Sequence, residues 1–342
     1  MANQENLLPF VSAMIVARNE SAYIEKSLNS LINQTYPKDR YEILLIDGNS
    51  NDNTVEIAKN TVRSYCENNG NRSFNIKFLE NPRQILAAGW NIGIKNSKGQ
   101  YVVRIDAHSF VPPDYISKCV AVMLKVKDAV CVGGVINSDT IGEKGKAVSY
   151  VLSSPFGIGN SKFRYSQKAE YVDTVAFGLY RKDIFEKVGY FDENLQRNQD
   201  IELHAKIRAA GGKFYLDPKI NLTYFSRNTT KSMIKQGYQN GKWNAIVFNK
   251  NPKSLSIRHI IPLLFVLGII GCLLLGLISS FFWYVLFIVL VLHLILGAVF
   301  ALQKTKKLSY ILTMPIMFML LHISYGAGTL INLVIPYKRI KS

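Results

Sequence analysis

The chain has 342 residues with a formal net charge of +17, and 48% of its residues are hydrophobic, which is enough for one large domain with an appendage. The N-terminal segment MANQENLLPF has no basic and no apolar region, so we expect no signal peptide. The four cysteines form no C-x-x-C pair and are expected to be reduced structural thiols. No nucleic-acid recognition motif is present, so the positive charge does not by itself indicate nucleic-acid binding.

Short apolar runs alternate with helical segments over the first part of the chain. Strands are predicted at 11–17, 41–46, 76–79, 101–105 and 129–135. Helices are predicted at about 21–33 with Ser21 as the cap, at about 54–66 with Asp52 or Asn53 as the cap, at 83–96, and from Pro112–Pro113 onward. This β-α-β-α order predicts a mainly parallel, Rossmann-like α/β sheet with helices on both faces.

Regular structure is expected to pause after the fifth strand. Residues 137–170 are richer in Gly, Ser and Lys and show no clear period, which is typical of a loop or a segment that covers a substrate. The elements predicted to follow are a strand at 171–177, helices at about 181–188 and 199–210, and a last strand at 213–216.

The C-terminal part is typical of a membrane protein. Residues 260–278 and 282–302 are each long and apolar enough to cross a hydrocarbon core of about 30 Å. Ser279–Ser280 is expected to form the turn on the far side, and the positive-inside rule places Arg258 and the lysines at 304, 306 and 307 in the cytoplasm. Residues 227–258 are basic and contain aromatic side chains, as expected of an interfacial segment facing anionic lipid.

A third apolar stretch, 311–335, allows two interpretations. It contains Pro315, Gly326 and Gly328, and both of its flanks are basic. It is therefore either a third span or a segment that is re-entrant or lies in the membrane plane. We expect a multi-pass protein of the inner, cytoplasmic membrane, with a cytoplasmic domain at 1–226, the interfacial segment at 227–258 and an α-helical membrane region at 259–342.

Polar residues follow two of the predicted strands where each strand ends. Asp47 follows the second strand, and Asp106 and His108 follow the fourth. Ligands of open α/β sheets bind beyond the carboxyl ends of the strands, so these side chains are expected to border a nucleotide pocket with a divalent metal. The imidazole in place of a second carboxylate favours Mn²⁺ over Mg²⁺. The alternative is a turn aspartate beside a surface histidine, with Asp47 bonding only to loop backbone.

Further candidates lie near two predicted helix starts. Asn19 and Glu20 follow the first strand and either border the same pocket or begin a helix. Asp200 opens the helix at 199–210. It is either a general base for an acceptor hydroxyl or a carboxylate favoured by the helix dipole.

An amide, a cation and an indole lie within about one helical turn at Gln239, Lys242 and Trp243. This combination indicates contact with phosphate or with an acceptor sugar ring. Trp and Lys are also common at membrane interfaces, so anchoring there is the alternative.

Six ordered motifs resemble the family 2 glycosyltransferases, which have the GT-A fold. The motifs are VSAMIVARNE, IDGNSNDNT, NPRQILAAGWNIGIKNSKGQYVVRIDAHS, SSPFGIGNSKFR, VDTVAFGLYRKDIFEKVGYFDENLQRNQDIELHAKIRAAGG and GYQNGKW. They cover roughly residues 8–250. Within the family, the chain looks most like the membrane-associated, succinoglycan-biosynthesis ExoA-like branch.

The resemblance implies roles for the candidate residues. Asp47 would bind the nucleoside part of a UDP-sugar, and Asp106 with His108 would bind Mn²⁺ or Mg²⁺. Asp200 would be the general base. Gln239, Lys242 and Trp243 would match a Q-x-x-R-W-like motif, with a lysine point charge in place of the bidentate arginine. The chain departs from most of the family at three places. It reads D-G-N-S from Asp47 where most members read D-D-G-S. It has His108 where most have a second carboxylate, and Gln199 before Asp200 where Glu is usual.

The resemblance also implies an activity. It indicates a membrane-anchored inverting glycosyltransferase that moves a sugar from a UDP-sugar to a lipid-diphosphate-linked saccharide in exopolysaccharide or capsule biosynthesis, beside other polysaccharide-assembly proteins. One alternative is a processive synthase, for which two or three spans are too few to form a channel. Another is an inactive sugar-nucleotide sensor or scaffold subunit, which His108 keeps open.

Overall fold

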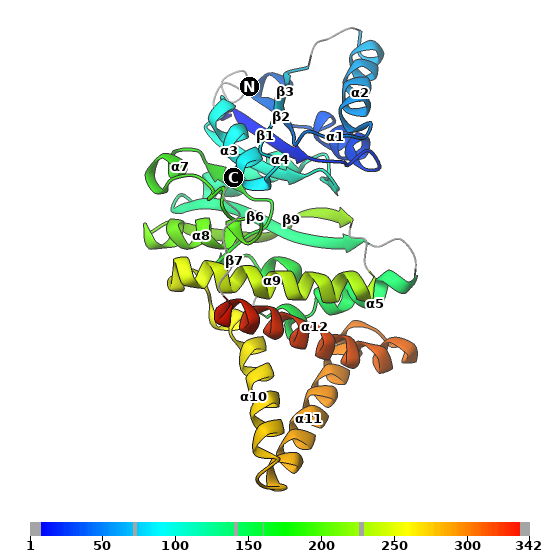
Figure 1. Ribbon diagram of the computed structural model, residues 1–342. Coiled ribbons are helices and arrows are strands. Elements are labelled where there is room, and N and C mark those ends of the chain that lie inside the picture. Colours follow the sequence, from blue (N-terminus) through cyan, green and yellow to red (C-terminus); the bar gives the residue numbers. More distant parts are fainter. Residues whose placement is uncertain (1–7, 71–73, 140–142, 160, 226–228, 336–342) are drawn as a thin grey trace. The chain divides into compact units, whose positions relative to one another are not determined.

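The computed structural model describes residues 8–70, 74–139, 143–159, 161–225 and 229–335. The chain forms two compact units (Figure 1). The sheet unit comprises Met1–Asn137 and Lys162–Phe225, and the helical unit comprises Ser138–Ser161 and Ser226–Ser342. A single boundary at residue 226 therefore does not divide the chain, because the inserted stretch at 138–161 packs with the C-terminal part.

The strands of the sheet unit form one sheet. Over the described residues it has nine strands in the order β3-β2-β1-β4-β8-β6-β9-β5, and β7 also pairs with β9. The strands are β1 (Val11–Ala17), β2 (Tyr41–Asp47), β3 (Ile76–Glu80), β4 (Tyr101–Asp106), β5 (Ser109–Phe110), β6 (Ala129–Asp139), β7 (Glu170–Val172), β8 (Leu179–Arg181) and β9 (Lys213–Phe225).

The first four strands are parallel, as predicted from the alternation of strands and helices. In this half, Ala17 lies opposite Asp47 on β2, and Val16 lies opposite Asp106 on β4. The other half is different, because β8, β5 and β7 pair antiparallel with their neighbours. These strands are only two or three residues long. Antiparallel pairing does not require the long crossover connection that joins parallel strands.

Helices cover both faces of the sheet, as predicted. They are α1 (Ile24–Ile32), α2 (Thr54–Asn68), α3 (Leu86–Asn96), α4 (Tyr115–Lys125), α7 (Asp183–Val188) and α8 (Gln199–Ala209). Side chains of β1 alternate between two cores: Ile15 belongs to the core with Leu28 of α1, and Met14 to the core with Trp90 of α3. The alternation follows from the two-residue period of a strand that is buried on both faces.

Three local predictions in the sheet unit were wrong. The apolar run at 171–177 is a strand only as far as Val172, and it continues as a buried loop, because apolar residues can be buried without pairing to a strand. Ser21 does not cap α1 through its side chain; its N–H donates to Asp52 Oδ2 at 3.2 Å, and the helix begins at Ile24. β9 continues through Pro218 to Phe225 instead of ending at residue 216.

The helical unit contains α5 (Glu143–Leu152), α6 (Pro155–Ile158), α9 (Thr230–Lys250), α10 (Ile261–Leu275), α11 (Phe281–Lys304) and α12 (Leu308–Val334). Short 3₁₀ turns lie at Pro252–Ser254 and Ile257–His259 in this unit, and at Lys38–Arg40 and Lys162–Arg164 in the sheet unit. The loop expected at 137–170 is therefore partly helical. Val148 and Val151 of α5 pack with Phe318 of α12, so tertiary burial stabilises a helix whose sequence has only a weak period.

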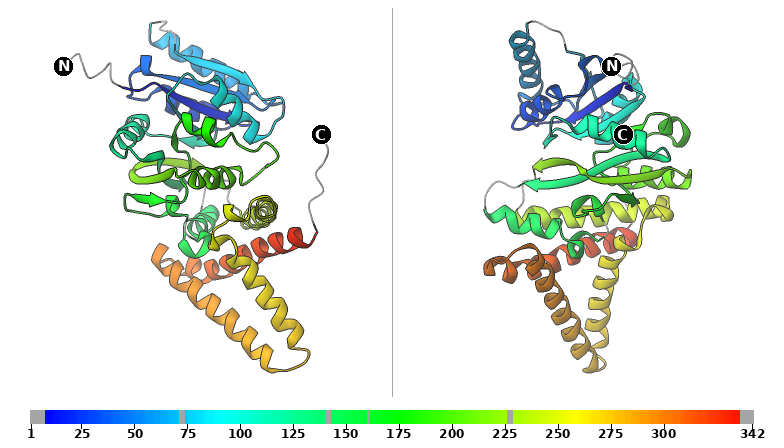
Figure 2. Two further views of the ribbon diagram at one scale, coloured as in Figure 1. Left: turned by 90° about the vertical axis from the view of Figure 1, so that its left-hand side faces the viewer. Right: turned by 180° about the vertical axis from the view of Figure 1, so that it is seen from behind.

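Three helices among the described residues are long and apolar enough to cross a membrane: Ile257–Leu275, Phe281–Lys304 and Leu308–Val334. The first two form a hairpin that turns near Ser279–Ser280, as predicted, and Trp283 Nε1 donates to Gly276 O at 3.0 Å there. α12 is one continuous helix that runs beside α9 and crosswise to α10 and α11 (Figures 1 and 2).

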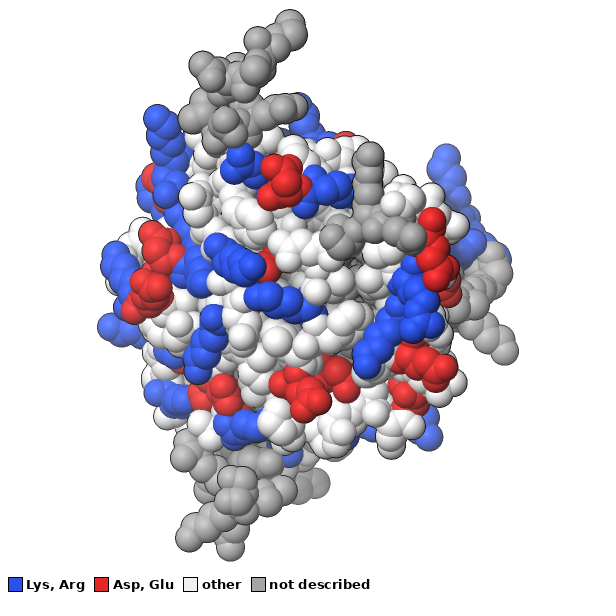
Figure 3. Space-filling model, turned by 90° about the horizontal axis from the view of Figure 1, so that it is seen from above, with Lys and Arg blue, Asp and Glu red and all other residues white. Residues whose placement is uncertain are grey.

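Charged side chains of both signs are visible on one face of the protein (Figure 3). On the face seen in Figure 3, Lys and Arg side chains are interspersed with Asp and Glu side chains. Mixed charge of this kind is typical of an ordinary solvated surface, so this face shows no continuous basic patch.

Candidate active site

The loops that follow β1, β2 and β4 border one cavity of about 220 Å³. Its lining residues are Val16, Ala17, Arg18, Glu20, Gly48, Asn81, Gln84, Ile85, Leu86, Asp106, Ala107 and His108. In the sheet order, β2 lies on one side of β1 and β4 on the other, so the strand order reverses here. Ligands of open α/β sheets bind at such a switch point, beyond the carboxyl ends of the strands.

The turn between β4 and β5 carries Asp106 and His108. Phe225 N–H at the end of β9 donates to His108 O at 3.1 Å, so the turn is held by strand pairing. The ring of Tyr224 packs edge-on against the imidazole, with 4.7 Å between centroids. His108 Nδ1 lies 3.1 Å from Glu20 Oε1. Long-range pairing thus brings Glu20, Asp106 and His108 together at the cavity.

The Asp106 carboxyl is buried among charged groups of both signs. Burial raises the pKa of the Asp106 carboxyl, and the negative charges of Glu20 and Asp200 add to the rise, while His108 and Arg104 lower it. Among the described residues, no three His, Cys, Asp or Glu side chains are arranged to hold a metal ion by themselves. The carboxylate and imidazole donors therefore fit a divalent cation that takes its other ligands from a substrate and water.

Asn19 and Asp47 stabilise the two loops next to the cavity. Asp47 Oδ1 accepts a hydrogen bond from Ser50 Oγ at 2.6 Å, and Oδ2 accepts one from Ser50 N at 3.0 Å. Asn19 has a left-handed backbone, with φ of 55°, and its Oδ1 accepts from Asn51 N at 3.0 Å. The loop role of Asp47 is thus observed, and its contact with a nucleoside stays a prediction. Gly48, its neighbour, lines the cavity.

Asp200 is the second residue of α8, and its charge affects the Asp106 carboxyl. Its Oδ1 accepts a hydrogen bond from Ile201 N at 2.9 Å, and Asn198, with φ of 58°, turns the chain into the helix. Its charge raises the pKa of Asp106, so the two carboxylates lie within electrostatic range. The first turn of α8 therefore brings a further carboxylate within electrostatic range of Asp106, and its role as a general base stays a prediction.

Arg104 is a site residue that the sequence did not single out. It precedes Asp106 by two positions on β4, and therefore points to the same face of the sheet. The rings around its guanidinium are those of Trp90, Tyr180 and Phe191, with centroids at 5.3, 5.6 and 5.0 Å. Burial lowers its pKa, but the charges around it, including those of Asp200 and Asp106, produce a net rise. The caged cation thus partly neutralises both carboxylates.

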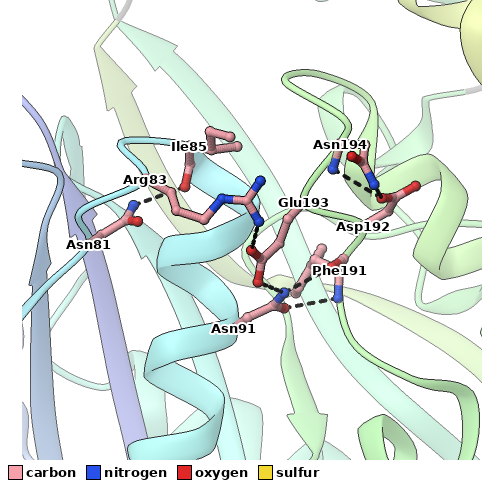
Figure 4. A network of polar contacts seen from close by, with 8 residues as sticks. All are labelled: Asn81, Arg83, Ile85, Asn91, Phe191, Asp192, Glu193 and Asn194. Atoms are coloured by element: carbon pink, nitrogen blue, oxygen red, sulfur yellow. Dashed lines mark hydrogen bonds and ion pairs between the residues drawn. The ribbon is translucent and has the colours of Figure 1, made fainter. Parts of the chain in front are cut away.

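Asn91 is a second residue that was missed. It is 4% exposed, and it ties α3 to the loop at 190–198 that leads into α8 (Figure 4). Its Nδ2 donates to Phe191 O at 2.9 Å and to Glu193 Oε1 at 2.8 Å, and its Oδ1 accepts from Phe191 N at 3.0 Å. Arg83 forms an ion pair with the same Glu193 carboxylate. The network fixes the loop that precedes Asp200.

Gln239, Lys242 and Trp243 lie on α9 of the helical unit. Trp243 is buried at 3% exposure, so its indole does not face lipid as an interfacial anchor would. Gln239 and Lys242 are partly exposed. The three residues share one helix, as expected from their spacing, and their contact with a diphosphate or sugar stays a prediction.

Comparisons with known proteins identify the family of this chain. Residues 12–189 match the protein family described as Glycosyl transferase family 2. A dolichyl N-acetyl-alpha-D-glucosaminyl phosphate 3-beta-D-2,3-diacetamido-2,3-dideoxy-beta-D-glucuronosyltransferase from Methanococcus voltae is 29% identical over 324 residues, which cover 93% of this chain and 95% of that protein. Succinoglycan biosynthesis protein ExoA from Rhizobium meliloti is 28% identical over 265 residues, which cover 75% and 76%. The chain is thus similar to ExoA, and it matches the archaeal transferase over a greater length.

A solved structure shows the same fold. Mannosyltransferase PcManGT from Pyrobaculum calidifontis, in complex with GDP-Man and Mn²⁺, superposes with a TM-score of 0.61 and covers 93% of this chain and 87% of that one, at 17% identity. At this identity the likeness concerns the fold alone, and it confirms the predicted GT-A architecture. The chain belongs to glycosyl transferase family 2: it is a glycosyltransferase with a GT-A sheet and long apolar C-terminal helices.

Proposed function

We propose that this protein is an inverting glycosyltransferase that moves a sugar from a nucleotide-diphosphate sugar to a lipid-phosphate-linked saccharide at the cytoplasmic face of the cell membrane. The observation that carries the proposal is the convergence of Glu20, Asp106 and His108 on the cavity at the switch point of the sheet. Asp200 lies within electrostatic range of that group.

In the proposed mechanism, Asp106 and His108 would hold a divalent cation, which would supply positive charge to neutralise a diphosphate leaving group. Asp200 accepts the proton of the acceptor hydroxyl, so that its oxygen attacks the sugar carbon opposite the leaving group. Arg104 keeps the local excess of negative charge moderate while no substrate is bound. Glu20 bonds to His108 Nδ1 and thereby fixes the orientation of the imidazole.

The donor nucleotide and the acceptor are proposed from similarity. The resemblance to family 2 favours UDP, whereas the solved structure with the same fold contains GDP-Man. The name of the Methanococcus relative specifies a dolichyl phosphate sugar as its acceptor, which supports a lipid with one phosphate. The resemblance to ExoA favours a lipid-diphosphate acceptor in exopolysaccharide assembly, with Gln239, Lys242 and Trp243 contacting phosphate. The acceptor test must therefore include both lipid classes.

The test is nucleotide release by the purified full-length protein in detergent with Mn²⁺. UDP- and GDP-sugars are each supplied alone, with a lipid-monophosphate-linked saccharide, and with a lipid-diphosphate-linked saccharide. We expect release from one donor that requires both metal and lipid and is lost in Asp200→Asn. Unchanged transfer by Asp200→Asn would contradict the role of the base. Nucleotide binding without turnover under every condition would instead support the sensor alternative.

A further inference from the structure

We propose that α12 lies in the plane of the membrane interface, with one face in lipid and the other on α9, so that only α10 and α11 cross the bilayer. The chain then returns to the side from which it entered. This inference rests on the proposed membrane attachment and is independent of which sugar is transferred. Its partner is a lipid leaflet with anionic headgroups.

The first observation is the one-sided exposure of α12. Its exposed large apolar residues are Leu308, Leu312, Ile316, Leu320, Ile323, Ile331 and Val334. At 100° per residue these positions form one stripe along the helix. The opposite side is buried at Met314, Met317, Phe318, Leu321, Gly328, Thr329 and Asn332. The sequence alone conceals this division, because both sides are largely apolar.

The second observation is that the buried side packs closely against α9. A Cβ on Gly241 of α9 would lie 2.0 Å from Tyr325 O, and a Cβ on Gly328 would lie 2.2 Å from Tyr238 O. Thr329 Oγ1 donates to Gly241 O at 3.2 Å. α12 lies next to α9 in Figure 1 and in the right-hand view of Figure 2. Such glycine contacts bring two backbones together and leave no room for lipid between them.

α9 is unsuited to the hydrocarbon core. It carries exposed lysines at Lys231, Lys235 and Lys250, and charged side chains at the bilayer centre are costly. If α12 stood upright across the bilayer, α9 would be carried into the core beside it. If α12 lies in the plane, the lysines of α9 remain in water or among headgroups. The packing of the two helices therefore decides against a third span.

The third observation concerns the hairpin and the glycines of α12. Gly326 lies against α10, where a Cβ would be 2.1 Å from Pro262 O, and Pro315 lies against Gly297 of α11. These contacts explain the small residues and the proline of α12 as packing features within an unbroken helix. They also hold α12 crosswise to the hairpin (Figure 1).

The charges at the two ends of α12 point to the same conclusion. Lys304, Lys306 and Lys307 precede the helix, and Lys338, Arg339 and Lys341 follow it in the sequence. A third crossing would place one of these basic groups on the far side, against the positive-inside rule. An in-plane helix keeps both groups on the cytoplasmic side, where they attract anionic lipid.

The experiment measures depth along the helix in the full-length protein, reconstituted into vesicles of phosphatidylethanolamine and phosphatidylglycerol. Nitroxide labels are attached to Leu312→Cys, Leu320→Cys or Ile331→Cys, and the signal of the parent chain with its native cysteines is subtracted. Depth is read from the ratio of oxygen to nickel-chelate accessibility. Labels at the exposed positions Phe287, Ile295 and Leu302 of α11 are the control for a crossing helix.

We expect the three α12 labels to report the same shallow depth, while the α11 labels change depth from one position to the next. A graded profile with Leu320 deepest would overturn the proposal. A second readout is labelling by a membrane-impermeant maleimide: Ser342→Cys should react from the same side as Asn69→Cys in the sheet unit, and Ser279→Cys from the other. Reaction of Ser342→Cys from the side of Ser279→Cys would overturn it too.

These outcomes are separate from the test of transfer. Shallow α12 labels in a protein that releases no nucleotide would leave the in-plane helix supported and the transferase proposal contradicted. Labels on α11 that detect no lipid would contradict membrane attachment, and with it the in-plane helix.

Discussion

The two units of the protein depend on different kinds of contact. In the sheet unit, the residues of the site are held by polar side chains that contact distant parts of the sequence, such as Asn91 to Phe191 and Asn19 to Asn51. In the helical unit, the helices meet through glycines whose missing side chains allow backbone contact, as at Gly241 and Gly328. Loss of one polar group should therefore disturb the site in the first unit, and addition of one methyl group should disturb the contact of α9 with α12 in the second.

The largest effect is expected from Asp106→Asn, which removes the carboxylate proposed to hold the cation. Several kcal/mol of transition-state stabilisation correspond to about a 10³-fold loss of kcat/KM. The assay is nucleotide release at varied Mn²⁺ concentration, and chelation of the metal should reproduce the loss in the parent chain. The matched control is Asp39→Asn, an exposed aspartate that is not among the cavity-lining residues. Equal activity of the two variants would refute the metal site.

The next effect is expected from Gly241→Ala in the helical unit. Its Cβ would meet a backbone oxygen at 2.0 Å, so the helices must move apart, at a cost of about 1–3 kcal/mol. The measurement is the thermal unfolding midpoint in detergent. Gly268→Ala is the control, because a Cβ there has no heavy atom within 4 Å among the described residues. A midpoint lowered equally by both substitutions would show that helix contact is not the cause.

Asn91→Ala tests the opposite kind of contact. It leaves Phe191 N and O and the Glu193 carboxylate without the amide partner, which should destabilise the protein by about 1–3 kcal/mol. Displacement of the loop before Asp200 should also lower kcat by about tenfold to a hundredfold, with donor affinity little changed. Asn96→Ala is the control, since Asn96 is an exposed residue on the same helix whose Nδ2 donates to Ile92 O.

The turnover number kcat and the donor affinity are both measured for Asn91→Ala and for its control Asn96→Ala. A loss of donor affinity as large as the loss of kcat in Asn91→Ala would place its effect on the donor pocket instead of the loop before Asp200. Asn91→Asp keeps an acceptor for Phe191 N but places a buried carboxylate beside Phe191 O and Glu193, so we expect a loss of activity at least as large as in Asn91→Ala.

The smallest effect separates the two roles of Asp47. If its carboxylate contacts the nucleoside as well as the loop, Asp47→Asn should weaken nucleotide binding about tenfold or more, since hydrogen bonds to charged groups are worth about 1.5–3 kcal/mol. Ser50→Ala removes only the hydroxyl partner in the loop. Calorimetric titration with the nucleotide compares them. Equal affinities of the two variants would assign Asp47 to loop stability alone.

Much of the site could be predicted from local sequence. Asp47, Asp106 and Glu20 each follow an apolar run that forms a parallel strand, and the carboxyl ends of parallel strands meet at one edge of the sheet. The hairpin of α10 and α11 was equally predictable, because length and uniform apolarity are sufficient to recognise helices that could cross a membrane. Short strands such as β8, and the helix α5, were not recognised, because burial by distant residues stabilises them more than their own pattern does.

By itself, the sequence determined the family, the parallel half of the sheet, the strand-end position of the acidic residues and the presence of apolar helices long enough for a membrane. Only the tertiary structure decided that Arg104 is caged by three rings, that Asn91 holds a loop 100 residues away, and that 138–161 belongs with the C-terminal helices. It also showed which side of α12 is buried. The physical reason is that periodicity reports whether a face is apolar, whereas the partner of that face depends on segments far away in the chain.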